Sequence, residues 1–256
     1  MFFILVALFA VANADTTITL VNKCPHPIWP ALWGNPQPST KGFKLDAGKS
    51  IPIRIPTHWD AGRIWARTEC TGSDGSLTCK TGDCGNKLQC IHTGEKPATL
   101  AEFTMNGAGG QVFYDISYVD GSNVPMTIKP VANTFKKESG QYNCGTAGQC
   151  SKDLRQAADP SILFKVNGKT LGTWAACSPI TNNNPQYCCS GAHDKPETCP
   201  KSAIPNKFYG ALKKVCPQSY FYAYDDRLST WTCRPSSGRT APDFVVTFCE
   251  VTGLQG

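Results

Sequence analysis

The chain has 256 residues, of which 14 are cysteine, with 41% hydrophobic and 17% charged residues and a formal net charge of +6. This length permits one large domain or two modest ones. The basic residues are spread along the chain, C-x2-C pairs are absent and the four histidines are scattered, so we expect no nucleic-acid partner, no metal site and no cofactor.

The first 14 residues form a short apolar run that ends in Ala12-Asn13-Ala14. An apolar run with such a small-residue end predicts a cleaved signal peptide, and it is too short to span a bilayer. We therefore expect a secreted mature chain that starts near Asp15, without stable membrane insertion, and we assume a monomer. The even number of cysteines predicts seven disulfides, whose pairing the residues alone leave open.

Short alternating runs predict β-strands from the mature N-terminus onward. The first is Thr16–Val21, and residues 49–55 alternate in the same way. Residues 28–33 contain Pro30, which favours an edge strand or a bulge.

A further alternating run, residues 62–68, places Arg63, Trp65 and Arg67 on one face. One interpretation is an exposed indole covered by the stems of two cations. The other is an arginine that keeps a neighbouring carboxylate ionised. Residues 70–96 then lose all periodicity and contain four cysteines, which predicts a small lobe held by local disulfides.

Two runs, Thr99–Phe103 and Phe113–Gly121, flank the glycine-rich residues 106–110 and together predict a β-hairpin. If the turn is symmetric, Glu102 faces Asp115 across the two strands. Like charges in that position are mildly destabilising, so strand stability does not explain the pair.

Asp120 follows just past the predicted strand end. Acidic residues on an exposed hairpin face are common, which is the simpler interpretation. The alternative is a carboxylate cluster at one end of a sheet, suited to binding or to acid–base chemistry.

After a further strand at residues 124–130, the composition changes near residue 138. Residues 138–219 are rich in Cys, Gly, Asn and Pro and predict a disulfide-rich domain inserted into a core domain of residues 15–137 and 220–256. Within it we expect one helix from a Ser151 cap to Ala158 and another capped by Asn206. Strands return at residues 221–224, 230–232 and 243–248, so the predicted class is mainly β, a sandwich or barrel.

Several motifs in order resemble the thaumatin-like family, which includes thaumatin and the antifungal pathogenesis-related group 5 proteins. The resemblance spans Thr16 to Cys249 and implies a β-sandwich with an inserted disulfide-rich domain, short helices and a small loop lobe. The matching segments are Ile64–Cys70, Cys79–Cys84, Thr99–Phe103, Asn123–Met126, Tyr187–Cys189 and Val246–Cys249.

The resemblance also implies a disulfide framework. Family members usually have sixteen cysteines, and here one bridge is missing, with Asp159-Pro160 in place of one Cys-Pro. The implied pairs are Cys24–Cys249, Cys70–Cys79, Cys84–Cys90, Cys144–Cys233, Cys150–Cys216, Cys177–Cys188 and Cys189–Cys199.

Members of the family have an acidic cleft between the two domains, lined by one Arg, one Glu and three Asp. Carried onto this sequence, the resemblance implies Glu102 and Asp115 as catalytic residues and Arg63, Asp120 and Asp225 as substrate-binding residues. Arg63 is preferred to Arg67 by its motif position, and the choice between Asp225 and Asp226 stays open. Ser122 replaces a phenylalanine that is usual in the family.

The function implied is binding of β-1,3-glucan, or another cell-wall polysaccharide, by a secreted antifungal protein. One alternative is weak endo-β-1,3-glucanase activity, with Glu102 as the acid and Asp115 as the partner carboxylate. Another is inhibition of glycanases or proteases.

Overall fold

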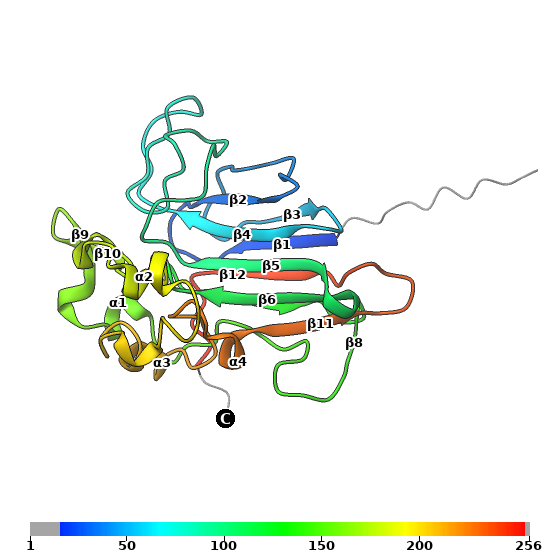
Figure 1. Cartoon of the computed structure of the whole chain (residues 1–256). Helices are drawn as coiled ribbons and strands as arrows, with labels where there is room; N and C mark the ends of the chain where they lie inside the picture. Colours follow the sequence, from blue (N-terminus) through cyan, green and yellow to red (C-terminus); the bar gives the residue numbers. More distant parts are fainter. Residues whose placement is uncertain (1–15, 254–256) are drawn as a thin grey trace, which may run out of the picture.

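Two β-sheets pack against each other in the computed structural model, which describes residues 16–253 (Figure 1). The predicted signal peptide lies outside these residues. The four-stranded sheet has the order β3 (Ser50–Ile55), β1 (Thr16–Asn22), β12 (Phe244–Phe248) and β7 (Met126–Pro130). The six-stranded sheet has the order β2 (Trp29–Asn35), β4 (Asp60–Arg67), β5 (Leu100–Gly107), β6 (Gln111–Ser117), β11 (Trp231–Pro235) and β8 (Phe135–Lys136).

The core lies between the two sheets because each strand alternates apolar residues toward its partner sheet. In β1, Ile18 and Leu20 are completely buried. The Phe244 ring of β12 contacts Phe103 of β5 and Tyr114 of β6, with ring centroids 5.4 and 5.1 Å apart. The two packed sheets are therefore the β-sandwich that the resemblance implies.

Most of the predicted strands are confirmed. β2 is an edge strand with an irregular register between Trp33 and Asn35, as Pro30 predicts. The predicted strand at residues 221–224 is wrong, because this segment forms turns. Its aromatic residues pack against neighbouring rings, such as Phe221 on Tyr118 with centroids 4.9 Å apart.

Residues 138–219 contain short helices and one hairpin that the sequence analysis did not predict. The hairpin pairs β9 (Leu163–Val166) with β10 (Lys169–Thr173). The α-helices here are α1 (Leu154–Ala157), α2 (Pro185–Cys188) and α3 (Gly210–Lys213), and α4 (Asp226–Ser229) follows. Single 3-10 turns cover Ala108–Gly110, Pro160–Ile162, Pro179–Thr181, Gly191–His193 and Lys201–Ala203.

Both predicted helices are shorter than expected. α1 begins at Leu154 and is capped by the Asp153 side chain, which accepts from the Arg155 backbone N–H, so Ser151 is not the cap. α3 begins at Gly210, four residues after Asn206, and no side chain caps it. Because the α-helices of residues 16–253 are single turns, none is long enough to cross a membrane.

All fourteen cysteines are paired, and the seven implied disulfides are confirmed. At the lost bridge, the Asp159 side chain caps a 3-10 turn by accepting from the Ser161 N–H at 2.8 Å. The buried core runs without a break from β1 to Leu154 and Leu212, so the division at residues 138 and 219 stays a prediction.

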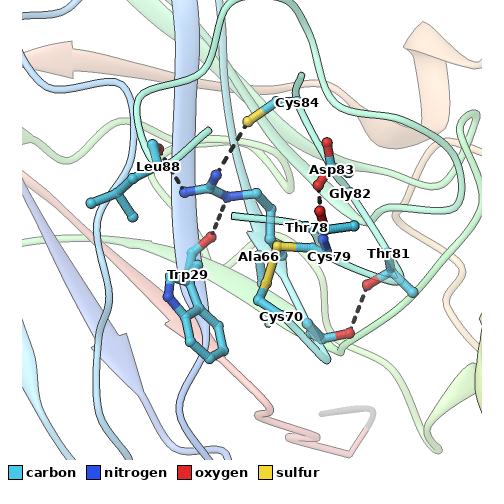
Figure 2. The surroundings of a disulfide bond; sticks show 12 residues. Trp29, Ala66, Cys70, Thr78, Cys79, Thr81, Gly82, Asp83, Cys84 and Leu88 are labelled. Carbon is cyan, nitrogen blue, oxygen red and sulfur yellow. Dashed lines mark hydrogen bonds between the residues drawn. A yellow bond between two sulfur atoms is a disulfide. The ribbon is translucent and has the colours of Figure 1, made fainter. Parts of the chain in front are cut away.

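The loop lobe packs on β4 through the face that carries Trp65 and Arg67, and both side chains are completely buried. The exposed-indole interpretation is therefore wrong. The Arg67 guanidinium donates to the carbonyls of Trp29 and Leu88 and to the Cys84 sulfur. Figure 2 shows Trp29, Leu88 and Cys84 beside the Cys70–Cys79 disulfide. Arg67 thus holds the lobe and is not available to the carboxylates.

Candidate functional site

Three charged side chains form a row across the six-stranded sheet. Arg63 of β4 lies opposite Glu102 of β5, and Glu102 lies opposite Asp115 of β6. Residues in register on adjacent strands project from the same face. The predicted Glu102–Asp115 pairing is therefore confirmed. Arg63 is the arginine that contacts a carboxylate, since its Nη2 atom lies 3.2 Å from Glu102 Oε1.

Asp115 has the least favourable surroundings for a negative charge in this row. Its Oδ1 atom is buried and has no hydrogen-bond partner. Burial raises the pKa of Asp115 well above its usual range, the negative charges of Glu102 and Asp226 raise it further, and Arg63 opposes both effects. This carboxyl group therefore tends to hold a proton at pH values where an ordinary aspartate is ionised.

Glu102 has a different balance. The pKa of Glu102 is also raised, because burial and the charge of Asp120 outweigh Arg63 and a hydrogen bond from the Ser117 side chain, which lower it. Arg63 and Glu102 remain accessible, with 29% and 27% of their side-chain surfaces exposed. The row therefore presents one carboxylate paired to a cation next to one carboxyl group that favours its neutral form.

Asp120 lies at the end of the row where β6 has ended. Lys96 Nζ lies 3.0 Å from Asp120 Oδ1 and also donates to the Cys177 carbonyl at 2.9 Å. It thus connects the sandwich to the disulfide-rich segment. A pocket of about 140 Å³ opens at this junction. It is lined by Lys96, Val119, Asp120, Ala176, Cys177, Tyr187, Cys188, Phe221, Tyr222 and Ala223.

Asp225 is not brought to the row. It is only 4% exposed, its Oδ2 atom lies 2.6 Å from Lys213 Nζ, and its Oδ1 atom accepts from the Tyr209 hydroxyl at 2.9 Å. The next residue, Asp226, is exposed and accepts from the Tyr220 hydroxyl at 2.8 Å. Because Asp226 acts on Asp115 electrostatically, it is the aspartate of this segment that belongs with the row.

Lys96 and Tyr220 were not predicted as site residues, whereas Asp226 was the open alternative to Asp225. Lys96 and Tyr220 are single polar residues outside the named helices and strands, and no periodicity marks them. Ser122, which replaces the usual phenylalanine, is buried and hydrogen-bonded to Thr173 of β10 at 2.8 Å. In the part of the chain that the structure describes, no three His, Cys, Asp or Glu side chains are arranged to hold a metal ion.

A disulfide-stapled β-sandwich with a row of carboxylates on one sheet is the class of protein that this fold and site define. Residues 22–250 match the Thaumatin family, and the chain belongs to this family of thaumatin-like, pathogenesis-related defence proteins.

Three comparisons illustrate this membership. The chain is 39% identical over 251 residues to pathogenesis-related thaumatin-like protein 3.5 of Cryptomeria japonica, covering 96% of this chain and 95% of the relative. It is 39% identical over 241 residues to a glucan endo-1,3-beta-glucosidase of Prunus avium, covering 91% of this chain and 90% of the relative. A solved laminaripentaose-producing beta-1,3-glucanase shares the fold, with a TM-score of 0.50 and 12% identity over 91% of this chain and 98% of that one.

Proposed function

We propose that this chain is a secreted antifungal protein that binds β-1,3-glucan of cell walls along the Arg63–Glu102–Asp115 row. The observation that carries the proposal is the register that aligns these three side chains on one face of the sheet. Asp120 and Asp226 extend the site, and Asp226 takes the place expected of Asp225. The predicted signal peptide, the seven disulfides and the pathogenesis-related relatives support secretion and a defence role.

The charge balance of the site suits a neutral polysaccharide. Glu102, Asp120 and Asp226 bring negative charge, Asp115 favours its neutral form, and Arg63 and Lys96 bring two positive charges. Carboxylates accept hydrogen bonds from sugar hydroxyl groups, and the two cations donate to sugar oxygens. The site therefore offers many directional contacts while it carries little net charge.

The pocket at the Asp120 end adds an apolar surface. Tyr187, Phe221 and Tyr222 contribute to its lining. An aromatic ring and the apolar face of a pyranose pack well because both are flat and weakly polar. Phe221 and Tyr222 are only 4% and 6% exposed, so the half-buried Tyr187 is the ring of this lining that offers a face to a sugar.

Binding to a linear β-1,3-glucan tests the proposal through Glu102→Gln. Loss of the charged acceptor and of its pairing with Arg63 should weaken binding by about 5- to 30-fold, on the basis of about 1–2 kcal/mol for one charge-assisted contact. Glu138→Gln is the matched control, because Glu138 pairs with Arg234 and Lys136 outside the row. Equal binding by the parent and Glu102→Gln would refute the proposal.

A second candidate function, weak endo-β-1,3-glucanase activity, is favoured by the environment of Asp115. A buried carboxyl group with a raised pKa is suited to protonate a leaving oxygen, and an ionised carboxylate beside it is suited to act as nucleophile or base. The contacts favour Asp115 as the acid and Glu102, paired with Arg63, as the partner, which reverses the roles expected from the resemblance. If it operates, Asp115→Asn and Glu102→Gln each abolish release of reducing ends, whereas equal release by the variants would rule it out.

A further inference from the structure

A second cavity, whose lining shares no residue with the carboxylate row or with the pocket beside Asp120, lies at the open edge of the sandwich. There the edge strand of one sheet, β3, meets the edge strand of the other, β2, and the loop that follows it. The cavity has a volume of about 470 Å³, larger than the pocket beside Asp120. It is lined by Leu32, Pro38, Ser39, Thr40, Phe43, Ile51, Pro52, Ile53, Arg54 and Ile55.

The apolar character of this edge groove follows from the position of β3. Alternation turns Ile51, Ile53 and Ile55 toward the interior of the sandwich. Ile55 is completely buried, but β3 has no neighbouring strand on its outer side, and Ile51 keeps 37% of its surface exposed. Together with Leu32 and Phe43, these side chains form an apolar trough that the chain itself leaves partly uncovered.

The charges at the groove have one sign. No acidic residue contributes to its lining, whereas Arg54, which alternation places on the outer, exposed face of β3, borders it. The Arg54 guanidinium has no ion pair and no hydrogen bond within residues 16–253, unlike Arg63, Arg67, Arg155, Arg234 and Arg239. Lys41, which precedes Phe43 in the same loop, lies over the Trp33 ring with Nζ 5.8 Å from its centroid. The trough is therefore bordered by positive charge.

We propose that this edge groove binds one fatty acid, with its acyl chain along the accessible side chains of Phe43, Ile51 and Ile53 and its carboxylate at Arg54. Volumes of about 300–1,000 Å³ are typical of small-ligand sites, and burial of apolar chain drives such binding. Pairing of the carboxylate with a free guanidinium adds a charge-assisted contact. An added peptide strand fits less well, since Pro52 in the middle of β3 offers no N–H to a partner.

Equilibrium dialysis of the mature protein with labelled palmitate tests this inference, with 1-hexadecanol as the uncharged probe of equal chain length. We expect saturable binding of one palmitate per chain. Arg54→Gln should weaken palmitate binding about tenfold and leave hexadecanol binding unchanged, which corresponds to about 1.4 kcal/mol. Lys129→Gln is the matched control, because it removes an exposed cation from β7, the opposite edge of the same sheet.

Ile51→Glu places a carboxylate in the trough at a side chain that is already partly exposed, so it should block both probes without unfolding the protein. Glu102→Gln should leave palmitate binding unchanged, which separates this site from the carboxylate row. The inference is overturned if palmitate does not saturate, if Arg54→Gln and Lys129→Gln bind it equally, or if the groove is occupied by a second copy. Sedimentation would reveal that second copy as a dimer that Ile51→Glu dissociates.

Discussion

Replacing Asp115 with asparagine should change how the stability of this protein depends on pH. The pKa of Asp115 is raised in the folded chain by burial and by the charges of Glu102 and Asp226, while the unfolded chain has an ordinary aspartate pKa of about 3.9. The folded parent therefore holds a proton that the unfolded chain has lost. Its stabilising effect is complete below about pH 4 and disappears as the pH rises through the folded-state pKa.

The dependence of the unfolding free energy on pH follows from the one proton that Asp115 binds. Between the two pKa values, the free energy of unfolding of the parent should fall by about 1.4 kcal/mol per pH unit relative to Asp115→Asn, which cannot ionise at this position. Removal of the Asp115 charge also lowers the pKa of Glu102, an effect of the same sign. The variant should thus gain stability over the parent as the pH rises from 4 toward 8.

Urea denaturation followed by tryptophan fluorescence, with the disulfides intact, measures this difference at each pH. Asp46→Asn is the control, because Asp46 is an exposed aspartate paired with Lys44 at the surface. Its pH profile should run parallel to that of the parent. Parallel profiles for the parent and Asp115→Asn, or a difference that shrinks as the pH rises, would refute the reasoning.

Three further substitutions test other parts of the structure. Lys213→Met leaves the buried Asp225 carboxylate unpaired and should cost about 3–5 kcal/mol in urea denaturation at pH 7, so a loss below about 1 kcal/mol would contradict the buried ion pair. Arg67→Met removes the donor to four groups of the lobe and its supporting strand and should speed amide exchange in residues 84–90, whereas unchanged exchange would show that the disulfides alone hold the lobe. Lys96→Met removes the cation that pairs with Asp120. The uncompensated negative charge of Asp120 then raises the pKa of Glu102 further. The onset of glucan binding should then move to higher pH, and an unmoved onset would count against the role of Glu102.

The central pair of the site could be predicted from the sequence because its cause is local. A glycine-rich turn between two alternating runs predicts a hairpin, and Glu102 lies opposite Asp115 although the register shifts between Thr104 and Gly107. Alternation also placed Arg63, Trp65 and Arg67 on one face, but it could not distinguish the residue that meets the carboxylates from the two that meet the lobe. That difference depends on what packs over each position.

The remaining site residues depend on distant partners. Asp225 and Asp226 are adjacent, and Asp225 is the buried one because it contacts Lys213 and Tyr209, which are distant in the sequence. The β9–β10 hairpin did carry a local signal, because Asn167 and Gly168 both have the positive φ of a two-residue hairpin turn. Residues 221–224 show the opposite case, since their aromatic residues favour strands but pack here in turns.

Chemical-shift mapping in solution tests the central claim most directly. A labelled mature protein would be titrated with a linear β-1,3-linked pentasaccharide, and the perturbed backbone amides would be located on the fold. We expect saturable changes concentrated at Arg63, Glu102, Asp115 and Asp120 and at the adjoining pocket. Perturbations confined to another surface, or none at millimolar sugar, would contradict the claim.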